Sequence, residues 1–382
     1  MDVLDLLDLM VTEKASDLFF SVGTPVHAKI EGVTRPLQTD PLTSSEAKQL
    51  AYSLMNEKQI AEFEERLELN MAISAAQIGR FRVNVFMQRG EPGMVVRHIK
   101  SKIPPVVALG LPVVLERLVM LKRGLILVTG ATGSGKSTTL AAMINHRNEE
   151  ATGHILTIED PIEFIHEHKR SVVDQREVGI DTLSYEHALK NALRQAPDVI
   201  MIGEIRDRLT MQQAIAYAET GHLCLSTLHA NNANQAMERI INFFPEDAHR
   251  QLLIDLSVNL AGVISMRLVP GLQQTLVPAV EVLLQSPYMS DLIAKGEIAA
   301  IKEVIGKSTE TGMCTFDQAL YKLYADGQIS REEALRNADS KTDLGLRIRL
   351  AAGIEPNATG TALSIESSRP ANAPSQRRRP PG

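Results

Sequence analysis

A glycine-rich stretch, GATGSGKS at residues 130–137, carries the clearest chemistry in this 382-residue sequence. It matches the pattern G-x-x-x-x-G-K-[ST], in which backbone N–H groups surround phosphates. The stretch follows an apolar run, residues 125–128, and precedes a predicted helix whose N-terminal dipole favours anions. We expect Lys136 to contact the β- and γ-phosphates and Ser137 to bind Mg²⁺. The residues expected to contact ATP are Gly130, Ala131, Thr132, Gly133, Ser134, Gly135, Lys136, Ser137 and Thr138.

Acidic side chains follow two further apolar runs. Glu204 comes soon after residues 199–202, and Glu159, Asp160 and Glu163 end the stretch HILTIEDPIE. Because the carboxyl ends of parallel strands meet at the edge where ligands bind, we expect these groups near the phosphate loop. Carboxylates so close together repel one another, which implies either Mg²⁺ or an arginine between them.

Two of these carboxylates compete for one catalytic role. Glu204 is expected to hold Mg²⁺ through water or to polarise the attacking water, and Glu163 is the alternative general base. The residue before Glu204 is Gly203, where many P-loop enzymes have an aspartate. The sequence does not separate the two candidates. The candidate metal ligands are Ser137, Glu159, Asp160 and Glu204.

Two histidines flank the apolar run LCLSTL. His229 ends this run, so it is expected at the same sheet edge, where it can sense the γ-phosphate. His222 precedes the run, and about seven strand residues span ~23 Å. We therefore expect His222 at the opposite edge unless the backbone turns. The candidate catalytic residues are Lys136, Glu163, Glu204 and His229.

The composition limits the class of protein. Hydrophobic residues make up 44% of the chain and charged residues 23%, which is typical of globular proteins. The net charge of −6 argues against nucleic acid as a partner. Cys224 and Cys314 lie far apart without metal-type spacing, so we expect neither a disulfide nor zinc, in keeping with a cytoplasmic protein. No stretch approaches ~20 uninterrupted apolar residues, so we expect no membrane-spanning helix.

The first third of the chain predicts a small α+β domain, residues 1–103, followed by a linker at 104–112. A helix is predicted over residues 2–14, with Leu4, Leu7 and Met10 or Val11 on one face. One or two helices are predicted over 44–66. Strands are predicted at residues 18–20, 26–30 and 81–86.

The pattern then changes to short apolar runs that alternate with helical stretches. This alternation is typical of an α/β domain with a largely parallel sheet, and we assign residues 113–355 to it. Residues 263–269 and 276–284 are predicted to add edge strands. Residues 288–350 are predicted to be helical. The Pro- and Ser-rich tail, residues 356–382, is predicted to be disordered and dispensable for hydrolysis.

Four motifs occur together: the phosphate loop, IEDPIE, GEIRD and STLHAN. In this order and spacing they resemble the Walker A, Asp, Walker B and His boxes of the secretion-type hexameric ATPases that drive type IV pili and type II secretion. The resemblance covers residues 1 to about 285, because ASDLFFSVGTPVHAKIEG is similar to the PAS-like N-terminal domain of that family. It implies a RecA-like P-loop NTPase domain with a smaller PAS-like α+β N-terminal domain.

The branch within this family can be narrowed. Assembly ATPases usually carry a long N-terminal region and a tetracysteine zinc site, and this sequence has neither. It is similar to the retraction branch, the PilT/PilU family, whose members depolymerise pili in twitching motility. The stretch DLGLRIRLAAG departs from the AIR-type motif of PilT-like proteins, and NALRQAPDVI and the tail are more similar to PilU. The resemblance therefore implies an accessory that cooperates with a PilT-type motor.

The resemblance also implies a homohexamer that is peripheral at the inner membrane and pushes on a platform protein there. ATP is expected between the N-terminal domain of one subunit and the C-terminal domain of the next. Arg80, Arg82 and Arg97 are the candidate cations near the γ-phosphate, and Arg80 and Arg82 share one strand face by their spacing. Arg194 is a weaker candidate, and so is Arg206, which has Glu204 or Asp207 as alternative partners.

Other classes stay open on the sequence alone. One is a nucleotide-dependent structural or regulatory subunit that hydrolyses ATP poorly, and another is a pilus or secretion assembly ATPase. A DNA-handling RecA-like ATPase is disfavoured by the net acidity. The direction of force is an expectation from the family alone.

Overall fold

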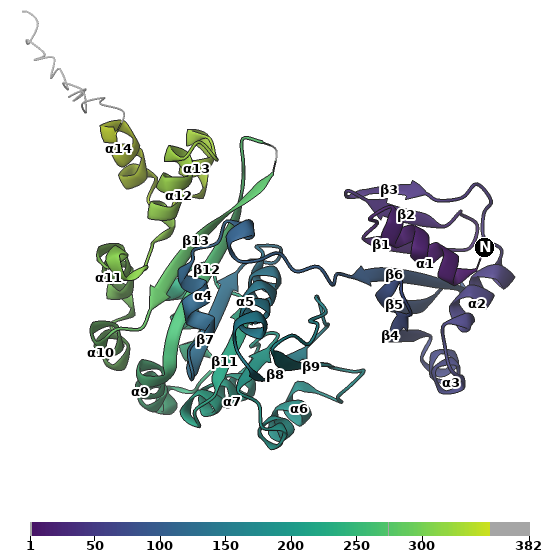
Figure 1. Ribbon diagram of the computed structural model, residues 1–382, viewed down its shortest axis with the longest axis horizontal. Coiled ribbons are helices and arrows are strands. Elements are labelled where there is room, and N and C mark those ends of the chain that lie inside the picture. Colours follow the sequence, from purple (N-terminus) through teal and green to yellow (C-terminus); the bar gives the residue numbers. More distant parts are fainter. Residues whose placement is uncertain (1, 274, 352–382) are drawn as a thin grey trace, which may run out of the picture.

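The computed structural model describes residues 2–273 and 275–351. The chain forms an N-terminal domain and a larger α/β domain, joined by an extended linker (Figure 1). The predicted linker at 104–112 contains one short 3₁₀ helix, Val107–Leu109. The predicted disordered tail, residues 356–382, lies outside the described residues.

The N-terminal domain is one antiparallel sheet covered by helices. The strand order is β3-β2-β1-β6-β5-β4. Its strands are β1 (Asp17–Phe20), β2 (His27–Ile30), β3 (Val33–Pro36), β4 (Glu68–Ala75), β5 (Gly79–Gln88) and β6 (Glu91–Ile99). Its helices are α1 (Val3–Thr12), α2 (Ser44–Ser53) and α3 (Glu57–Arg66). In β5, Phe81, Val83 and Val85 are buried, so Arg80 and Arg82 lie on the other face, as their spacing predicts.

The first helix differs from the prediction in the face that it buries. α1 buries Val3, Leu6, Leu7 and Met10, whereas Leu4 is 47% exposed. The prediction that Leu4 shares one face with Leu7 and Met10 was therefore wrong. Four leucines within six positions allow several apolar faces, and packing against the sheet selects among them. The start of the helix is set by a capping box between Asp2 and Asp5.

The α/β domain is built around a mostly parallel sheet with the order β13-β12-β7-β11-β10-β8-β9. Its strands are β7 (Gly124–Gly130), β8 (Gly153–Glu159), β9 (Ser171–Glu177), β10 (Val199–Ile202), β11 (Leu223–Leu228), β12 (Leu260–Pro270) and β13 (Leu276–Leu284). β12 lies inside the sheet, between β7 and β13, so its prediction as an edge strand was wrong. β13 is antiparallel to β12 and forms one edge, as predicted.

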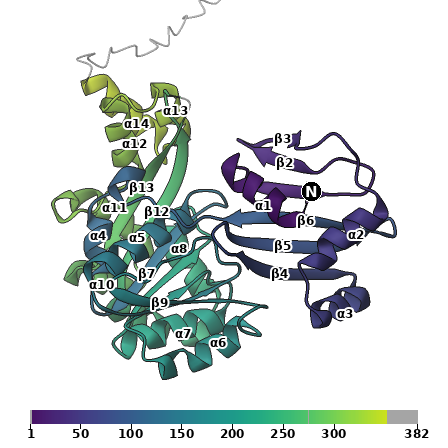
Figure 2. The same ribbon diagram turned by 45° about the vertical axis from the view of Figure 1, so that its right-hand side comes forward.

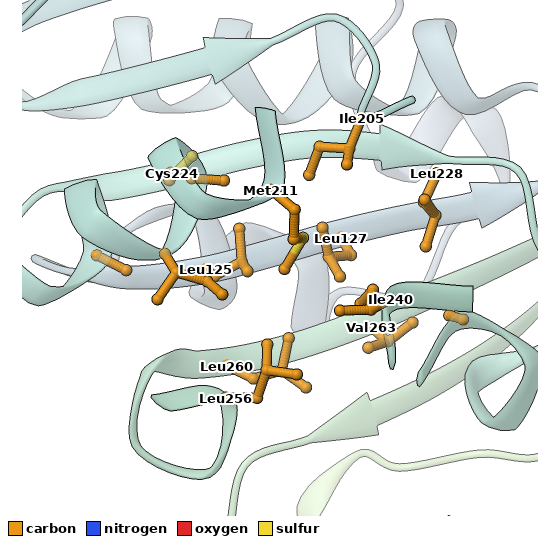
Figure 3. Close-up of a cluster of buried hydrophobic side chains, with 14 of the residues drawn as sticks. Leu125, Leu127, Ile205, Met211, Cys224, Leu228, Ile240, Leu256, Leu260 and Val263 are labelled. Carbon is orange, nitrogen blue, oxygen red and sulfur yellow. The ribbon is translucent and has the colours of Figure 1, made fainter. Parts of the chain in front are cut away.

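Helices cover both faces of this sheet, which explains why its central strands read as continuous apolar runs. The flanking helices are α4 (Val114–Val119), α5 (Lys136–Glu150), α6 (Tyr185–Ala192), α7 (Arg208–Glu219), α8 (Ala233–Asn242) and α9 (His249–Asn259). On one face, Leu125 and Leu127 of β7 pack in a cluster with Met211 of α7 and Ile240 of α8 (Figure 3). On the other face, Ile126 and Val128 pack in a cluster with Leu140 and Ile144 of α5 and Leu115 of α4.

The remaining helices follow β13 and confirm the helical prediction for residues 288–350. They are α10 (Pro287–Lys295), α11 (Ile301–Lys307), α12 (Phe316–Ala325), α13 (Arg331–Asn337) and α14 (Lys341–Ala351). Arg267 of β12 stacks on Phe316, with 3.8 Å from its guanidinium carbon to the ring centroid, and donates to Asp339 over 2.7 Å. No helix in the described part of the chain is both long and apolar enough to cross a membrane.

Candidate active site

The parallel order of β7, β11, β10 and β8 brings the carboxyl ends of these strands to one edge of the sheet. The phosphate loop follows β7 at this edge. Gly130 has φ of +151°, and a Cβ there would collide with Ser134 Oγ and lie 2.7 Å from the Met266 carbonyl oxygen. Gly135, with φ of +94°, forms the N-cap of α5. These two positions require glycine, as the motif predicts.

Lys136 is the first residue of α5 and is almost fully buried, at 9% exposed. Its Nζ donates to the carbonyl oxygens of Gly130 over 3.0 Å and of Ala131 over 2.9 Å. Burial lowers the pKa of Lys136, and the negative charge of Glu204 acts in the opposite direction. The first-turn N–H groups of α5 have no acceptor within the helix, so they point into the loop. The lysine and these amides together form a phosphate-binding cradle.

Glu204, which follows β10, has a basic side chain beside each of its carboxylate oxygens. Arg206 Nε lies 2.7 Å from Oε2, and His229 Nε2 lies 2.9 Å from Oε1. Arg206 also reaches Asp160, with 3.6 Å between Nη1 and Oδ2. Of the two partners expected for Arg206, the structure therefore shows Glu204 and adds Asp160. An arginine, one of the two groups implied by the sequence, lies between these carboxylates.

The other two carboxylates differ from each other in exposure. Glu159 is 7% exposed, and its Oε1 accepts from Thr157 Oγ1 over 2.7 Å and from Gln175 Nε2 over 3.2 Å. Burial raises the pKa of Glu159 to about 7, and the hydrogen bond from Thr157 opposes that rise. Glu163 is exposed to solvent. Glu159 is thus held inside the protein, whereas Glu163 is free to meet a solvent molecule.

These groups line one cavity of ≈ 1180 Å³. The α/β domain contributes the phosphate-binding lysine, the carboxylates and the histidine: Lys136, Glu159, Asp160, Glu163, Glu204 and His229. The N-terminal domain and the start of the linker contribute basic groups: Lys14, Arg97, His98, Lys100 and Lys102. Gly130 and Ala131 line a smaller hollow of ≈ 380 Å³, which also includes His229. The predicted site residues of the α/β domain are therefore close together.

Comparisons with known proteins agree on one assignment. A family profile described as "Type II/IV secretion system protein" matches residues 3–311. The chain is 55% identical to the type IV pilus ATPase PilU of Pseudomonas aeruginosa over 348 residues, which cover 90% of this chain and 91% of that protein. It is 42% identical to the type IV pilus retraction ATPase PilT of the same organism over 338 residues, 88% and 98% of the two chains. The chain belongs to the PilT/PilU family of type IV pilus retraction ATPases.

The fold comparison supports this assignment. A solved structure of the pilus retraction motor PilT with bound ADP matches with a TM-score of 0.84 and 40% identity. The match covers 91% of this chain and 99% of that one. The predicted α/β ATPase domain with a smaller N-terminal domain is thereby confirmed, and so is ATP as the nucleotide of the chain.

Mg²⁺ is the cofactor that the family resemblance implies. Among residues 2–273 and 275–351, no three His, Cys, Asp or Glu side chains are grouped closely enough to hold a metal by themselves. Mg²⁺ commonly uses one or two protein oxygens together with waters and substrate phosphates. The exposed Ser137 hydroxyl in the first turn of α5 and the exposed Asp160 carboxylate, which line the same cavity, fit that kind of binding.

The N-terminal arginines lie in two different places. Arg97 lines the cavity and donates from Nε to Asp17 over 2.7 Å. Arg80 and Arg82 are not among the cavity-lining residues of the described chain, and they lie close enough to Glu177 to act against the rise of its pKa. The basic wall opposite the phosphate loop comes from the same chain. The resemblance implies that a neighbouring subunit supplies cations to the site, and that arrangement stays a prediction.

Two further candidates lie away from the cavity. His222 precedes β11 at the opposite edge of the sheet, as the strand length predicts, and its Nδ1 lies 3.1 Å from Thr220 Oγ1. Arg194 is exposed in a short 3₁₀ helix after α6. Neither residue lines the large cavity of the described chain.

Sequence reasoning missed Tyr185, which lines the cavity and explains the unusual Walker B box. A Cβ at Gly203 would lie 2.8 Å from Tyr185 Oη and 3.3 Å from Glu159 Cα. A larger residue in place of Gly203 would therefore displace the Tyr185 hydroxyl and press on the end of β8. Burial raises the pKa of Tyr185, and the negative charge of Asp160 adds to the rise. No local motif marks Tyr185, since it is brought to β10 by the fold.

Proposed function

We propose that this chain is a motor subunit that hydrolyses ATP in the large cavity to drive type IV pilus retraction, as an accessory to a PilT-type motor. The observation that carries the proposal is the gathering of Lys136, Glu163, Glu204 and His229 around one cavity. The names of its relatives PilU and PilT supply the link to pili. The chain works as a homohexamer on the cytoplasmic face of the inner membrane, against a platform protein.

The geometry assigns a different chemical role to each of the Walker A, Asp, Walker B and His boxes. Lys136 and the amides of the phosphate loop bind the phosphates of ATP. Mg²⁺, when bound through Ser137 and Asp160 or Glu204, supplies positive charge that offsets the charge of the γ-phosphate. Both oxygens of Glu204 are engaged by Arg206 and His229, so Glu204 orients these two side chains.

The exposed Glu163 is left as the general base. A general base needs a lone pair that can accept a proton from water, and Glu163 faces the solvent of the cavity. The two candidates that the sequence left open thus have different roles in this proposal. Glu163 accepts the proton, and Glu204 keeps Arg206 of the Walker B box and His229 of the His box in place.

The test combines an enzyme assay with a motility assay. We expect the purified full-length chain to hydrolyse ATP and Lys136→Ala to reduce the rate at least about 100-fold, because the loop loses its phosphate-binding cation. We expect a strain that lacks this chain to keep surface pili but lose twitching, and Lys136→Ala to fail to restore it.

Each other outcome of these assays would assign the chain a different function. Restored twitching with Lys136→Ala would make the chain a structural or regulatory subunit. Loss of surface pili in the deletion strain would make it an assembly ATPase. ATPase activity that Lys136→Ala leaves unchanged would remove the enzymatic proposal itself.

A further inference from the structure

The loop after β8, residues 160–166, is held to β9 by one side-chain amide. Gln175 Nε2 donates to the Phe164 carbonyl oxygen over 2.9 Å and to Glu159 over 3.2 Å. Gln175 Oε1 accepts from the backbone N–H of His166 over 2.8 Å. A glutamine amide has two N–H donors and one carbonyl, so both of its ends are used here. The bonds fix the backbone on the carboxyl side of position 163.

A second β9 side chain fixes the amino side of the same position. Glu177 is 3% exposed, and its Oε2 accepts from the backbone N–H of Ile162 over 3.3 Å. Burial raises the pKa of Glu177, whereas that hydrogen bond and the nearby Arg82 and Arg80 act to lower it. Glu163 therefore lies between two points of attachment, one to Glu177 and one to Gln175.

The outer side of the loop pairs with the end of the N-terminal domain. Ile165 N donates to the Lys100 carbonyl oxygen over 3.1 Å, and Lys100 forms a parallel bridge with Phe164. Lys100 directly follows β6, whose end meets the α/β domain (Figure 2). Without the hydrogen bonds to β9, the loop would be free to follow any movement of Lys100.

We propose that Gln175 and Glu177 are positioning residues that hold Glu163 at the catalytic edge of the sheet by anchoring the 160–166 loop to β9. This inference rests on the proposed role of Glu163 as general base. The two side chains keep the base in register with the phosphate loop while the outer side of the same loop contacts the N-terminal domain. They act through the backbone, and neither of them lines the large cavity of the described chain.

The test measures kcat and ADP affinity for the full-length chain with Gln175→Leu. Leucine fills a similar volume but makes none of the three hydrogen bonds. We expect kcat to fall about 10- to 100-fold, the effect of a misplaced catalytic group, and ADP affinity to change less than about twofold. Gln175→Met also makes none of the three hydrogen bonds and has an unbranched side chain like glutamine. It should give a similar fall, and it serves if the leucine variant does not fold.

Glu163→Gln provides the decisive comparison. If Gln175 acts through Glu163, adding Gln175→Leu to Glu163→Gln should lower kcat by less than about twofold further. The full 10- to 100-fold loss in the double variant would overturn the inference, and so would a parallel loss of ADP affinity. Val172→Leu is the matched control, because Val172 is 53% exposed on the opposite side of β9.

A separate readout distinguishes failure of the inference from failure of the proposed function. If Glu163→Gln keeps normal turnover, the role proposed for Glu163 fails. Amide hydrogen exchange of residues 160–166 then decides on the anchoring. We expect faster exchange in Gln175→Leu and unchanged exchange in Val172→Leu. Exchange that is the same in Gln175→Leu and in the unmodified chain would overturn the inference.

Discussion

The two walls of the large cavity carry opposite charges and differ in how firmly their side chains are held. On the α/β wall, Lys136 donates to two carbonyl oxygens, Glu159 accepts from two side chains, and Glu204 contacts Arg206 and His229. The N-terminal wall presents basic side chains that are mostly exposed: Lys14, Arg97, Lys100 and Lys102. The linker allows these walls to belong to separately folded domains.

This difference indicates that the two walls have different roles in the reaction. Groups that are fixed before the reaction stabilise charge at low cost, because they do not have to reorganise. The α/β wall has this property, so we assign it binding and chemistry. The exposed cations of the N-terminal wall attract the nucleotide at longer range and depend on where their domain lies. Substitutions on the α/β wall should therefore mainly lower kcat, and by a large factor. Substitutions on the N-terminal wall should lower kcat/KM by a smaller factor.

The largest effect should come from the fixed wall. We expect Glu204→Ala to lower kcat about 100- to 1,000-fold, because Arg206 and His229 lose the carboxylate that orients them. Nucleotide affinity should stay within about twofold, since the bonds of Lys136 to its loop remain. ATPase rates and ADP binding measure the two quantities. Glu246→Ala, at an exposed acidic position outside the cavity, is the control. Loss of ADP binding would assign Glu204 to the phosphate cradle instead.

The charged groups and the histidine His229 of the α/β wall could be predicted from sequence because they lie in local motifs, whereas Tyr185 lies in none. The phosphate loop requires glycine at special backbone positions, and Glu204 and His229 come within two residues of the ends of short apolar strands. Parallel strands then place all three at one edge. The contents of the N-terminal wall have no such mark. Lys14 and Lys102 are ordinary surface lysines in the sequence, and only the folded chain brings them to the cavity.

The elements that support the site were also missed. β9 reads as SVVDQRE, with too few apolar residues for a buried strand, yet it supplies Gln175 and Glu177 to the 160–166 loop. Its strand conformation comes from pairing with β8, which is tertiary context. β4 and β6 were missed for the same reason, since cross-strand neighbours stabilise them. Local patterns thus identify the reacting groups better than the residues that position them.

Two histidines, one on each wall, allow the enclosure of the two walls to be compared through the pH dependence of stability. Burial lowers the pKa of His166, on the α/β wall, to about 4. Unfolded histidine titrates near 6.5, so the unfolded chain binds more protons below that pH and stability falls as pH drops from 6.5 toward 4. The loss from pH 7 to pH 5 should be about 2 kcal/mol. We expect the free energy of unfolding of His166→Gln, measured with urea, to fall by that much less between pH 7 and pH 5.

His98, on the N-terminal wall, provides the contrast. Burial also lowers its pKa, with Lys100 adding to the effect, but His98 is only half-buried. His98→Gln should therefore change the pH dependence of the free energy of unfolding less than His166→Gln does. Equal effects of the two substitutions would contradict the view that the α/β wall is the more firmly enclosed of the two.

The smallest effect should come from Arg97 on the N-terminal wall. Its side chain is 62% exposed, and Asp17 holds its Nε over 2.7 Å, so part of its charge is already paired. We expect Arg97→Ala to lower kcat/KM about tenfold at low salt, through a weaker attraction for ATP, and less at high salt because exposed charges are screened. Arg97→Lys should recover part of the loss. Lys29→Ala is the control, since Lys29 lies on the other side of Asp17 in the sheet and away from the cavity. A loss as large as that of Glu204→Ala, and independent of salt, would mean that the N-terminal wall takes part in the chemistry itself.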